Sequence, residues 1–406
     1  MSLPVRIWLK ICLFNLMIVA LIGTTLRYKI IFPLPWIDQK HLLHSHSHFA
    51  FTGWISQLLF VLMVHFLKQR NINISFKKYN LLFALNLVSA YGMLFSFFIQ
   101  GYAAVSIGFS TLSIIVSYFF AYRFWLDSSV LTINKIPVLF FKASLIFNIL
   151  SSAGAFALAF MMASKSSHQN WYLAAQYFFL HFQYNGWFFF ACMGLASEKW
   201  LRNCIPEKTF KHIFFLLALA CVPSYFLSTL WMKLPVWIYI IVILSAFAQI
   251  LAWIKISNAV FKSKPGLHIT HPGKYLLTLS FIALTIKLLL QLGSTIPSLS
   301  IIAFGFRPII IGYLHLVLLG IITLFLLGYI FSNELLPINK PVKTGALLFS
   351  TGVVLNECLL MIQGITAMGY ISLPYIQESL LLVALIMLTG LILLNFSSFS
   401  KNNASK

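Results

Sequence analysis

The chain has 406 residues, of which 60% are hydrophobic and only 9% are charged, and its formal net charge at pH 7 is +21. A soluble domain carries about 25% charged residues, so this composition excludes a soluble protein and predicts an all-α polytopic membrane protein. The five cysteines are scattered and form no Cys-x-x-Cys pair, which argues against a disulfide framework or a thiolate metal site.

Twelve segments are apolar over about the 20 residues that a membrane-spanning helix needs. The first segment is followed by Arg27 and Lys29 without a small-residue cleavage site, so we expect a retained helix and not a cleaved signal peptide. A single integral membrane domain over residues 1–406 is therefore predicted. The segments cover residues 8–26, 46–66, 79–100, 103–122, 137–162, 172–196, 211–231, 235–254, 275–291, 309–332, 344–366 and 376–396.

The basic residues are divided unequally between alternate loops. Most of the 28 Lys and Arg residues lie at the two termini and after the second, fourth, sixth, eighth and tenth segments. The positive-inside rule then predicts that both termini are cytoplasmic, and we expect the protein in the inner membrane of a bacterium. Because topology explains the positive charge, it does not indicate nucleic-acid binding. The opposite side holds only Arg27, Lys29, Lys40, Lys165, Lys233, Lys287 and Arg307.

One short pattern occurs three times. It reads HFAFTGW from His48, HFQYNGW from His181 and HLVLLGI from His315, so the histidines are 133 and 134 residues apart and each has a glycine five residues later. A fixed period of this kind predicts repeated structural units, here three pseudo-repeated four-helix arcs over roughly residues 1–135, 136–270 and 271–406. The predicted topology places all three histidines in the outer half of the bilayer. Ionisable residues there are usually inward-facing and functional, and polar residues that hold helices together are the alternative.

This arrangement resembles subunit I of the haem-copper oxidase superfamily, which includes the nitric oxide reductases. The architectural resemblance covers essentially the whole chain, whereas the motif resemblance is confined to the three histidine stretches. In that superfamily the histidines of helices 2 and 10 ligate a low-spin haem, and His48 and His315 match them. The helix-6 histidine binds copper, and His181 matches it. The resemblance therefore implies a bis-histidine haem and a copper site.

The sequence departs from that family at the catalytic centre. The His-x-His of family helix 10 is here Tyr313-Leu314-His315, and the His-His pair of helix 7 is absent. Tyr184 follows His181 after two residues, where the family has three. A complete binuclear oxygen-reducing centre is not expected. We expect instead a low-spin haem or a modified metal site with His181, Tyr184 and Tyr313. The NnrS family of haem- and copper-containing membrane proteins is a second resemblance.

Four histidines lie close together at the start of the second segment, in HLLHSHSH. On a helix, His41, His44 and His48 share one face, and on an extended segment His44, His46 and His48 do. Either arrangement suits copper or zinc, and solvated interfacial histidines are the alternative. His44 and His46 are also alternatives to His48 as the haem ligand.

Three other polar residues lie in or beside apolar segments. Arg307, eight residues before His315, stands where a haem propionate would accept hydrogen bonds from a guanidinium; an ordinary loop arginine is the alternative. Glu357 is an intramembrane carboxylate and a candidate for proton relay or a cation site. Lys287 lies at the outer end of the ninth segment, where snorkelling explains it without a function.

Three functions follow from these features. We expect a haem-binding membrane protein that acts as an oxidoreductase in electron transfer or in O2 or NO chemistry, with an electron donor or an oxidase-type subunit as its partner. A secondary transporter, favoured by Glu357, Lys142 and Lys287, lacks the inverted pair of broken helices typical of such proteins. An accessory membrane protein with remnant histidines is the third alternative. Soluble enzyme classes have no support, because P-loop, Gly-x-Ser-x-Gly, His-Glu-x-x-His and dinucleotide motifs are absent.

Overall fold

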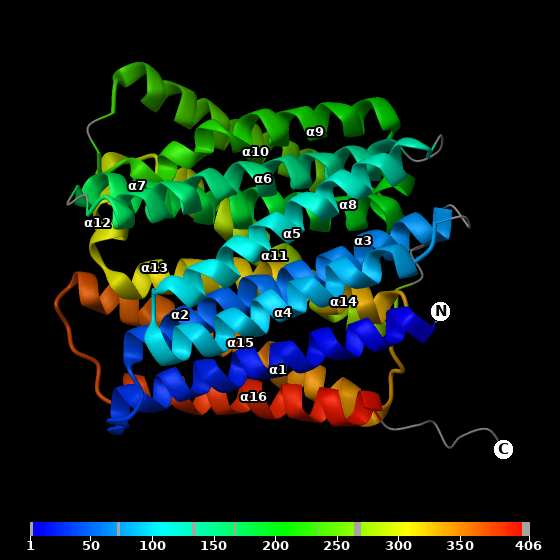
Figure 1. The fold of residues 1–406 in the computed structure, drawn as a ribbon. Helices are drawn as coiled ribbons and strands as arrows, with labels where there is room; N and C mark the ends of the chain where they lie inside the picture. Colours follow the sequence, from blue (N-terminus) through cyan, green and yellow to red (C-terminus); the bar gives the residue numbers. More distant parts are fainter. Residues whose placement is uncertain are drawn as a thin grey trace. The chain divides into compact units, whose positions relative to one another are not determined.

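The computed structural model describes residues 3–70, 74–131, 135–165, 168–232, 234–263 and 269–399. Within these ranges the chain is helical and has no strand (Figure 1). Apolar runs of this length form helices in a bilayer because an α-helix satisfies its backbone hydrogen bonds within the segment. The basic residues Lys233, Lys264, Lys401 and Lys406, which contribute to the predicted topology, lie outside the described residues.

The chain divides into two compact units, which are described separately. The first comprises residues 1–120, 269–279 and 323–406, and α1 and α16 lie side by side in it (Figure 1). Helices α15 and α16 also pack closely, because a Cβ atom at Gly345 would lie 2.6 Å from the Gly390 carbonyl oxygen. The helices of this unit are α1 (Leu3–Ile31), α2 (Gln39–Phe49), η1 (Ala50–Ser56), α3 (Gln57–Arg70), α4 (Lys77–Gln100), most of α5 (Ala104–Ser129), the start of α11 (His271–Gly293), α14 (Leu324–Ser332), α15 (Lys340–Met368) and α16 (Ile376–Phe399).

The second unit comprises residues 121–268 and 280–322. Helix α6 packs against α7, η2 and α8, and α10 packs against α9 and η4. Aromatic rings fill part of its core, where Phe140 contacts Phe190, Phe210 and Phe214. Its helices are α6 (Lys135–Ala163), α7 (Gln169–His181), η2 (Phe182–Phe188), α8 (Phe189–Lys199), η3 (Leu201–Asn203), α9 (Glu207–Cys221), η4 (Pro223–Thr229), α10 (Val236–Lys262), the rest of α11, α12 (Pro297–Gly305), α13 (Arg307–His315) and most of η5 (Leu316–Thr323).

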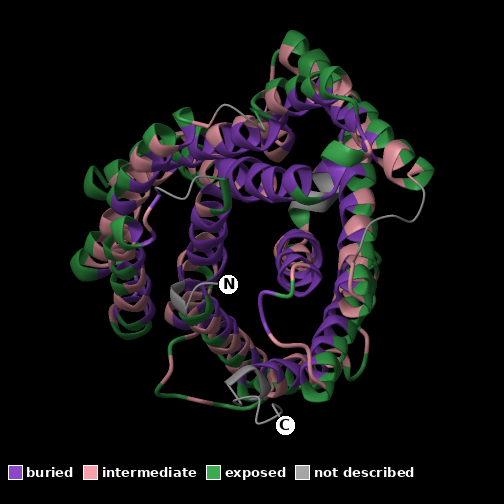
Figure 2. Cartoon of the chain, turned by 90° about the vertical axis from the view of Figure 1, so that its right-hand side faces the viewer, coloured by how far each residue is buried: buried purple, intermediate pink, exposed green. Residues whose placement is uncertain are grey.

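Ten helices of the described residues are long and apolar enough to cross a membrane, or eleven if the bent pair α9 and η4 forms one span. In Figure 2 individual helices carry buried residues on one side and exposed residues on another. Large apolar side chains lie on the exposed sides, including Leu81, Leu219 and Phe396. Lipid covers such a surface at no cost, so the chain is an integral membrane protein. Of the twelve predicted segments, 172–196 and 211–231 are not among the ten; the second bends by 40° between α9 and η4.

The span formed by α2, η1 and α3 is the most deeply buried of these candidate spans, with 78% of its most apolar window buried. Its neighbours in the first unit are α1 and α4. The four predicted histidines of the second segment all lie on α2. The structure therefore places the four histidines on the first helix of this span, where each of them is half-buried.

Candidate functional site

Each of the three repeat histidines lies at the start of a π-helical segment. His181 and His315 are the last residues of α7 and α13 and directly precede η2 and η5, while His48 is followed by one residue of α2 and then η1. The described part of the chain has no further π-helical segment. Such turns are rare and occur frequently at functional sites.

Side chains of neighbouring helices bind the backbone of η1. Asn15 on α1 donates from Nδ2 to the Gly53 carbonyl at 2.6 Å, and Asn86 on α4 donates to the Thr52 carbonyl at 3.1 Å. Tyr91 in turn donates to Oδ1 of Asn15 at 2.7 Å. A π-helical turn displaces carbonyls from the regular i to i−4 pattern, and an unpaired carbonyl in a membrane interior is costly. These side chains therefore stabilise the π-helical conformation.

The His181 ring is buried, with 2% of the residue exposed. Its Nε2 donates to the Cys221 carbonyl at 2.8 Å, and the Asn185 amide donates to its Nδ1 at 3.1 Å. The ring is therefore a neutral imidazole with both nitrogens paired inside the second unit. A copper ion at His181 has to replace one of these two partners.

Tyr184 and Tyr313, the other predicted metal ligands, lie near each other in the second unit. Their ring centroids are 6.3 Å apart in an edge-to-face arrangement, and the Tyr184 ring is 6.5 Å from the His181 ring. Asn185, and not a tyrosine, occupies the position four residues after His181 and bonds its ring. Within the described ranges, no group of three or more His, Cys, Asp or Glu side chains is arranged to hold a metal ion.

Neither Asn185 nor Cys221 was predicted from the sequence as a partner of His181. The position four residues after a helical histidine is a signal for Asn185, because residues that far apart are neighbours on a helix. The partner at Cys221 is a backbone carbonyl on another helix, for which a sequence carries no signal.

His315 has a different hydrogen-bond pattern. Its Nδ1 lies 2.8 Å from the Ile311 carbonyl oxygen in the preceding turn. A carbonyl only accepts, so Nδ1 carries the proton and Nε2 is the basic nitrogen. Metal-binding histidines typically have this arrangement, with one nitrogen fixed by a backbone carbonyl and the other directed at the metal. Arg307 is the first residue of α13 and is exposed, about 12 Å along the helix from His315.

Because residues 39–49 are helical, the helical alternative for the histidine cluster is the correct one. His48 Nε2 is joined to the Tyr102 hydroxyl by a hydrogen bond of 2.9 Å, and its ring stacks on Phe97 at 4.3 Å. The His44 ring meets the same Tyr102 ring edge-on at 4.6 Å. His41 lies on this face too, since a Cβ atom at Gly101 would be 2.5 Å from its Nε2.

The remaining nitrogens of this cluster differ in their surroundings. His44 Nε2 is buried and has no hydrogen-bond partner among the described residues. His46 points instead toward α1, where a Cβ atom at Gly23 would lie 3.1 Å from its Cε1. His44 therefore carries a buried ring nitrogen without a protein partner, whereas the Nε2 of His48 is hydrogen-bonded to Tyr102.

Glu357 lies on α15 in the first unit and is half-buried. The neighbouring Asn356 side-chain amide donates to its Oε1 at 3.2 Å. The predicted intramembrane carboxyl thus has an amide partner on its own helix.

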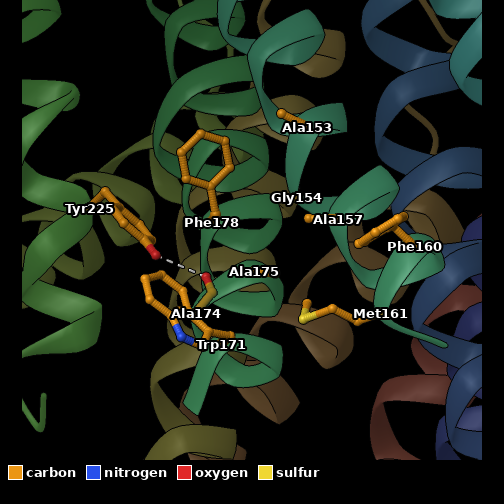
Figure 3. Close-up of a pocket in the computed structure, with 10 residues that line it drawn as sticks. All are labelled: Ala153, Gly154, Ala157, Phe160, Met161, Trp171, Ala174, Ala175, Phe178 and Tyr225. Carbon is orange, nitrogen blue, oxygen red and sulfur yellow. Dashed lines mark hydrogen bonds between the residues drawn. The ribbon is translucent and has the colours of Figure 1, made fainter. Parts of the chain in front are cut away.

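A cavity of about 410 Å³ lies in the second unit. Figure 3 shows its mainly apolar lining, in which the Tyr225 hydroxyl donates to the Ala174 carbonyl at 2.9 Å. Because that hydroxyl is already engaged, the cavity offers little polar chemistry. None of the predicted site residues lines it; the lining residues are Ala153, Gly154, Ala157, Phe160, Met161, Trp171, Ala174, Ala175, Phe178 and Tyr225.

His48 belongs to the first unit and His315 to the second, so their predicted pairing stays a prediction. No protein-family model matches this chain, and no curated protein sequence is significantly similar to it.

Proposed function

We propose that this chain is a haem-binding integral membrane protein, built from three four-helix repeats and resembling haem-copper oxidase subunit I. His48 and His315 are its proposed axial ligands, with His44 and His46 as alternatives on α2. In this proposal it acts in electron transfer or in O2 or NO chemistry, without a complete binuclear centre. Copper held by His181, Tyr184 and Tyr313 is the proposed modified site.

The observation that carries the proposal is the π-helical segment that begins at each repeat histidine. Three rare turns at equivalent positions of the sequence repeat support both the repeat and a common role for these positions. An ordinary helix-packing histidine needs no such turn.

The residues present fit haem ligation at two points. The hydrogen bond from His315 Nδ1 to the Ile311 carbonyl makes Nε2 the basic nitrogen, which is the nitrogen a haem iron would take. On α2, His44 Nε2 is buried and has no hydrogen-bond partner among the described residues. His48 Nε2 is hydrogen-bonded to Tyr102, so His48 would have to give up this bond to hold iron through that nitrogen. When bound, haem would supply one-electron chemistry, and the protein would hold its iron and exclude water.

A reduced-minus-oxidised optical spectrum of the protein, purified from a haem-replete host, tests the proposal. We expect a sharp α band that His315→Ala abolishes and His48→Ala weakens. If His44→Ala or His46→Ala removes the band while His48→Ala does not, the ligand on α2 is reassigned. If the wild-type protein shows no band, the proposal is wrong and the transporter or accessory function replaces it.

A further inference from the structure

Lys287 is a basic residue buried within a membrane-spanning helix. It lies on α11, and only 5% of the residue is exposed. Its ammonium group makes no hydrogen bond or ion pair with a described residue of the second unit. Snorkelling to the membrane surface does not account for a lysine that is this deeply buried.

The second unit offers no carboxylate for Lys287. Its only acidic residues are Asp127, Glu198 and Glu207. Each is paired with a basic residue one turn away on its own helix, at 3.2 Å, 3.8 Å and 2.8 Å, respectively. A buried cation without an anionic partner is unfavourable, and an anionic ligand would supply the missing partner.

The packing of α11 shows which residues of the neighbouring helices lie at the same height as Lys287 in the second unit. Ser280 Oγ donates to the Ile321 carbonyl at 2.8 Å, and a Cβ atom at Gly320 would lie 3.3 Å from the Ala283 Cβ. Helix α11 therefore runs antiparallel to η5 and α13, so a residue later in α11 lies beside a residue earlier in η5 or α13. Lys287 is one turn beyond Ala283 on the same face, which places it at the level of His315.

A second polar group lies beside Lys287 on this face. Gln291, one turn further along α11, is buried, and its Oε1 has no hydrogen-bond partner among the described residues. The terminal amide rotates easily about its last torsion, so it can present either its NH2 group or its oxygen. An ammonium and an amide one turn apart are suited to the two oxygens of a carboxylate. Lys287 also lies within electrostatic range of His181 and Cys221.

We propose that Lys287 and Gln291 bind a carboxylate group of a ligand at the level of His315. In the haem-loaded protein this carboxylate is a haem propionate, an identification that rests on the proposed function. A small free carboxylate has the same chemistry, and the experiment separates the two sources.

The test uses Lys287→Met, the conservative variant Lys287→Arg, and Lys142→Met as a matched control. Lys142 also lies on a membrane helix of the second unit, but its ammonium contacts the Trp125 ring at 4.6 Å and the Ser129 hydroxyl at 3.4 Å. Haem-free full-length protein in detergent is titrated with haem and with haem dimethyl ester, whose propionates are blocked. Thermal unfolding of the same haem-free proteins is measured with acetate or chloride at constant ionic strength.

We expect Lys287→Met to weaken haem binding by about tenfold or more, because hydrogen bonds to charged groups contribute about 1.5–3 kcal/mol. Lys287→Arg retains binding, Lys142→Met is unchanged, and the dimethyl ester binds the wild type and Lys287→Met equally. If only acetate stabilisation depends on Lys287, a free carboxylate is the ligand and the carboxylate site stands. If neither haem affinity nor acetate stabilisation differs between Lys287→Met and the wild type, Lys287 is a neutral buried amine and the proposal is overturned. A wild type that binds no haem disproves the proposed function alone, because the acetate measurement still decides the role of Lys287.

Discussion

The Asn15 side-chain amide on α1 donates a hydrogen bond of 2.6 Å to the Gly53 carbonyl inside η1. We expect Asn15→Leu to destabilise the protein by about 1 kcal/mol, the usual size of such bonds between membrane helices. Asn80→Leu is the control, because Asn80 accepts a longer bond of 3.2 Å from Trp8 at a part-buried position. Unfolding of the purified variants is followed by circular dichroism. Equal losses in the two variants would show that the bond to η1 has no special role.

The glycine of η2 allows a close approach of α6. A Cβ atom at Gly186 would lie 2.5 Å from the Phe147 Cβ, which is too near the backbone to move easily. Gly186→Ala should therefore cost about 1–3 kcal/mol. Gly108→Ala, with nothing within 4 Å, should be neutral or stabilising, because alanine favours a helix. Melting temperatures of the two variants decide the point, and a Gly186→Ala protein as stable as the wild type contradicts the close packing.

Asp38 caps the helix that carries the histidine cluster and lies outside the membrane-spanning segment. The backbone N–H of His41 donates to its carboxylate at 2.8 Å, and this bond is the main reason why the pKa of Asp38 is lowered. A lowered pKa contributes stability above the unfolded-state value of about 3.9, and this contribution is lost as the pH falls through the folded-state value.

Asp38→Asn keeps the cap but cannot titrate. We expect the wild type to lose its advantage over this variant as the pH is lowered from about 7 to about 3. Melting temperatures across that range give the difference directly. A difference that does not change with pH would show that Asp38 makes no charge-dependent contribution.

His181 has both ring nitrogens paired. His181→Ala leaves the Cys221 carbonyl and the Asn185 amide without their partner, which should cost about 1–3 kcal/mol. His168→Ala is the control, because His168 precedes α7 and makes no side-chain capping bond. Copper content is measured on the same samples. A stability loss that appears only in copper-loaded protein would assign His181 to a metal site.

The predicted orientation places both termini in the cytoplasm. Reporter domains fused before Met1 and after Lys406 should both be active in the cytoplasm and inactive outside it. An externally exposed C-terminal reporter would overturn the even number of spans, and with it the predicted depth of the three histidines.

The sequence predicted the apolar helices well because lipid imposes a strong and simple requirement. The predicted segments 344–366 and 376–396 correspond to α15 and α16. Helix α12, a short element between two predicted segments, was missed, since nine residues are too few to register as a span. The break after Cys221 coincides with Pro223, a helix breaker that the sequence displays.

The π-helical turns could not be predicted. An α-helix and a π-helix differ by one residue in the closing hydrogen bond, and in a uniformly apolar run such as the one after His315 no polar residue marks the period. The sequence also could not show that His41, His44 and His48 share one face, because the spacing of the histidines fits both a helix and an extended chain. The donors to η1, Asn15 and Asn86, come from helices that are distant in sequence, so only the fold brings them to their carbonyls.

The three π-helical segments also bear on how related chains should be aligned. Losing one residue from such a segment turns the closing bond from i+5 to i+4, so the helices on both sides keep their faces in phase. Losing one residue from a regular α-helix instead rotates everything beyond it by about 100°. Gaining one residue turns an i+4 closing bond into an i+5 bond. The pattern His-x-x-x-Tyr therefore differs from His181-Phe182-Gln183-Tyr184 of this chain by the insertion of one residue between the histidine and the tyrosine. Alignments of such chains should place their single-residue gaps inside η1, η2 and η5, where a length change leaves both flanking helices intact.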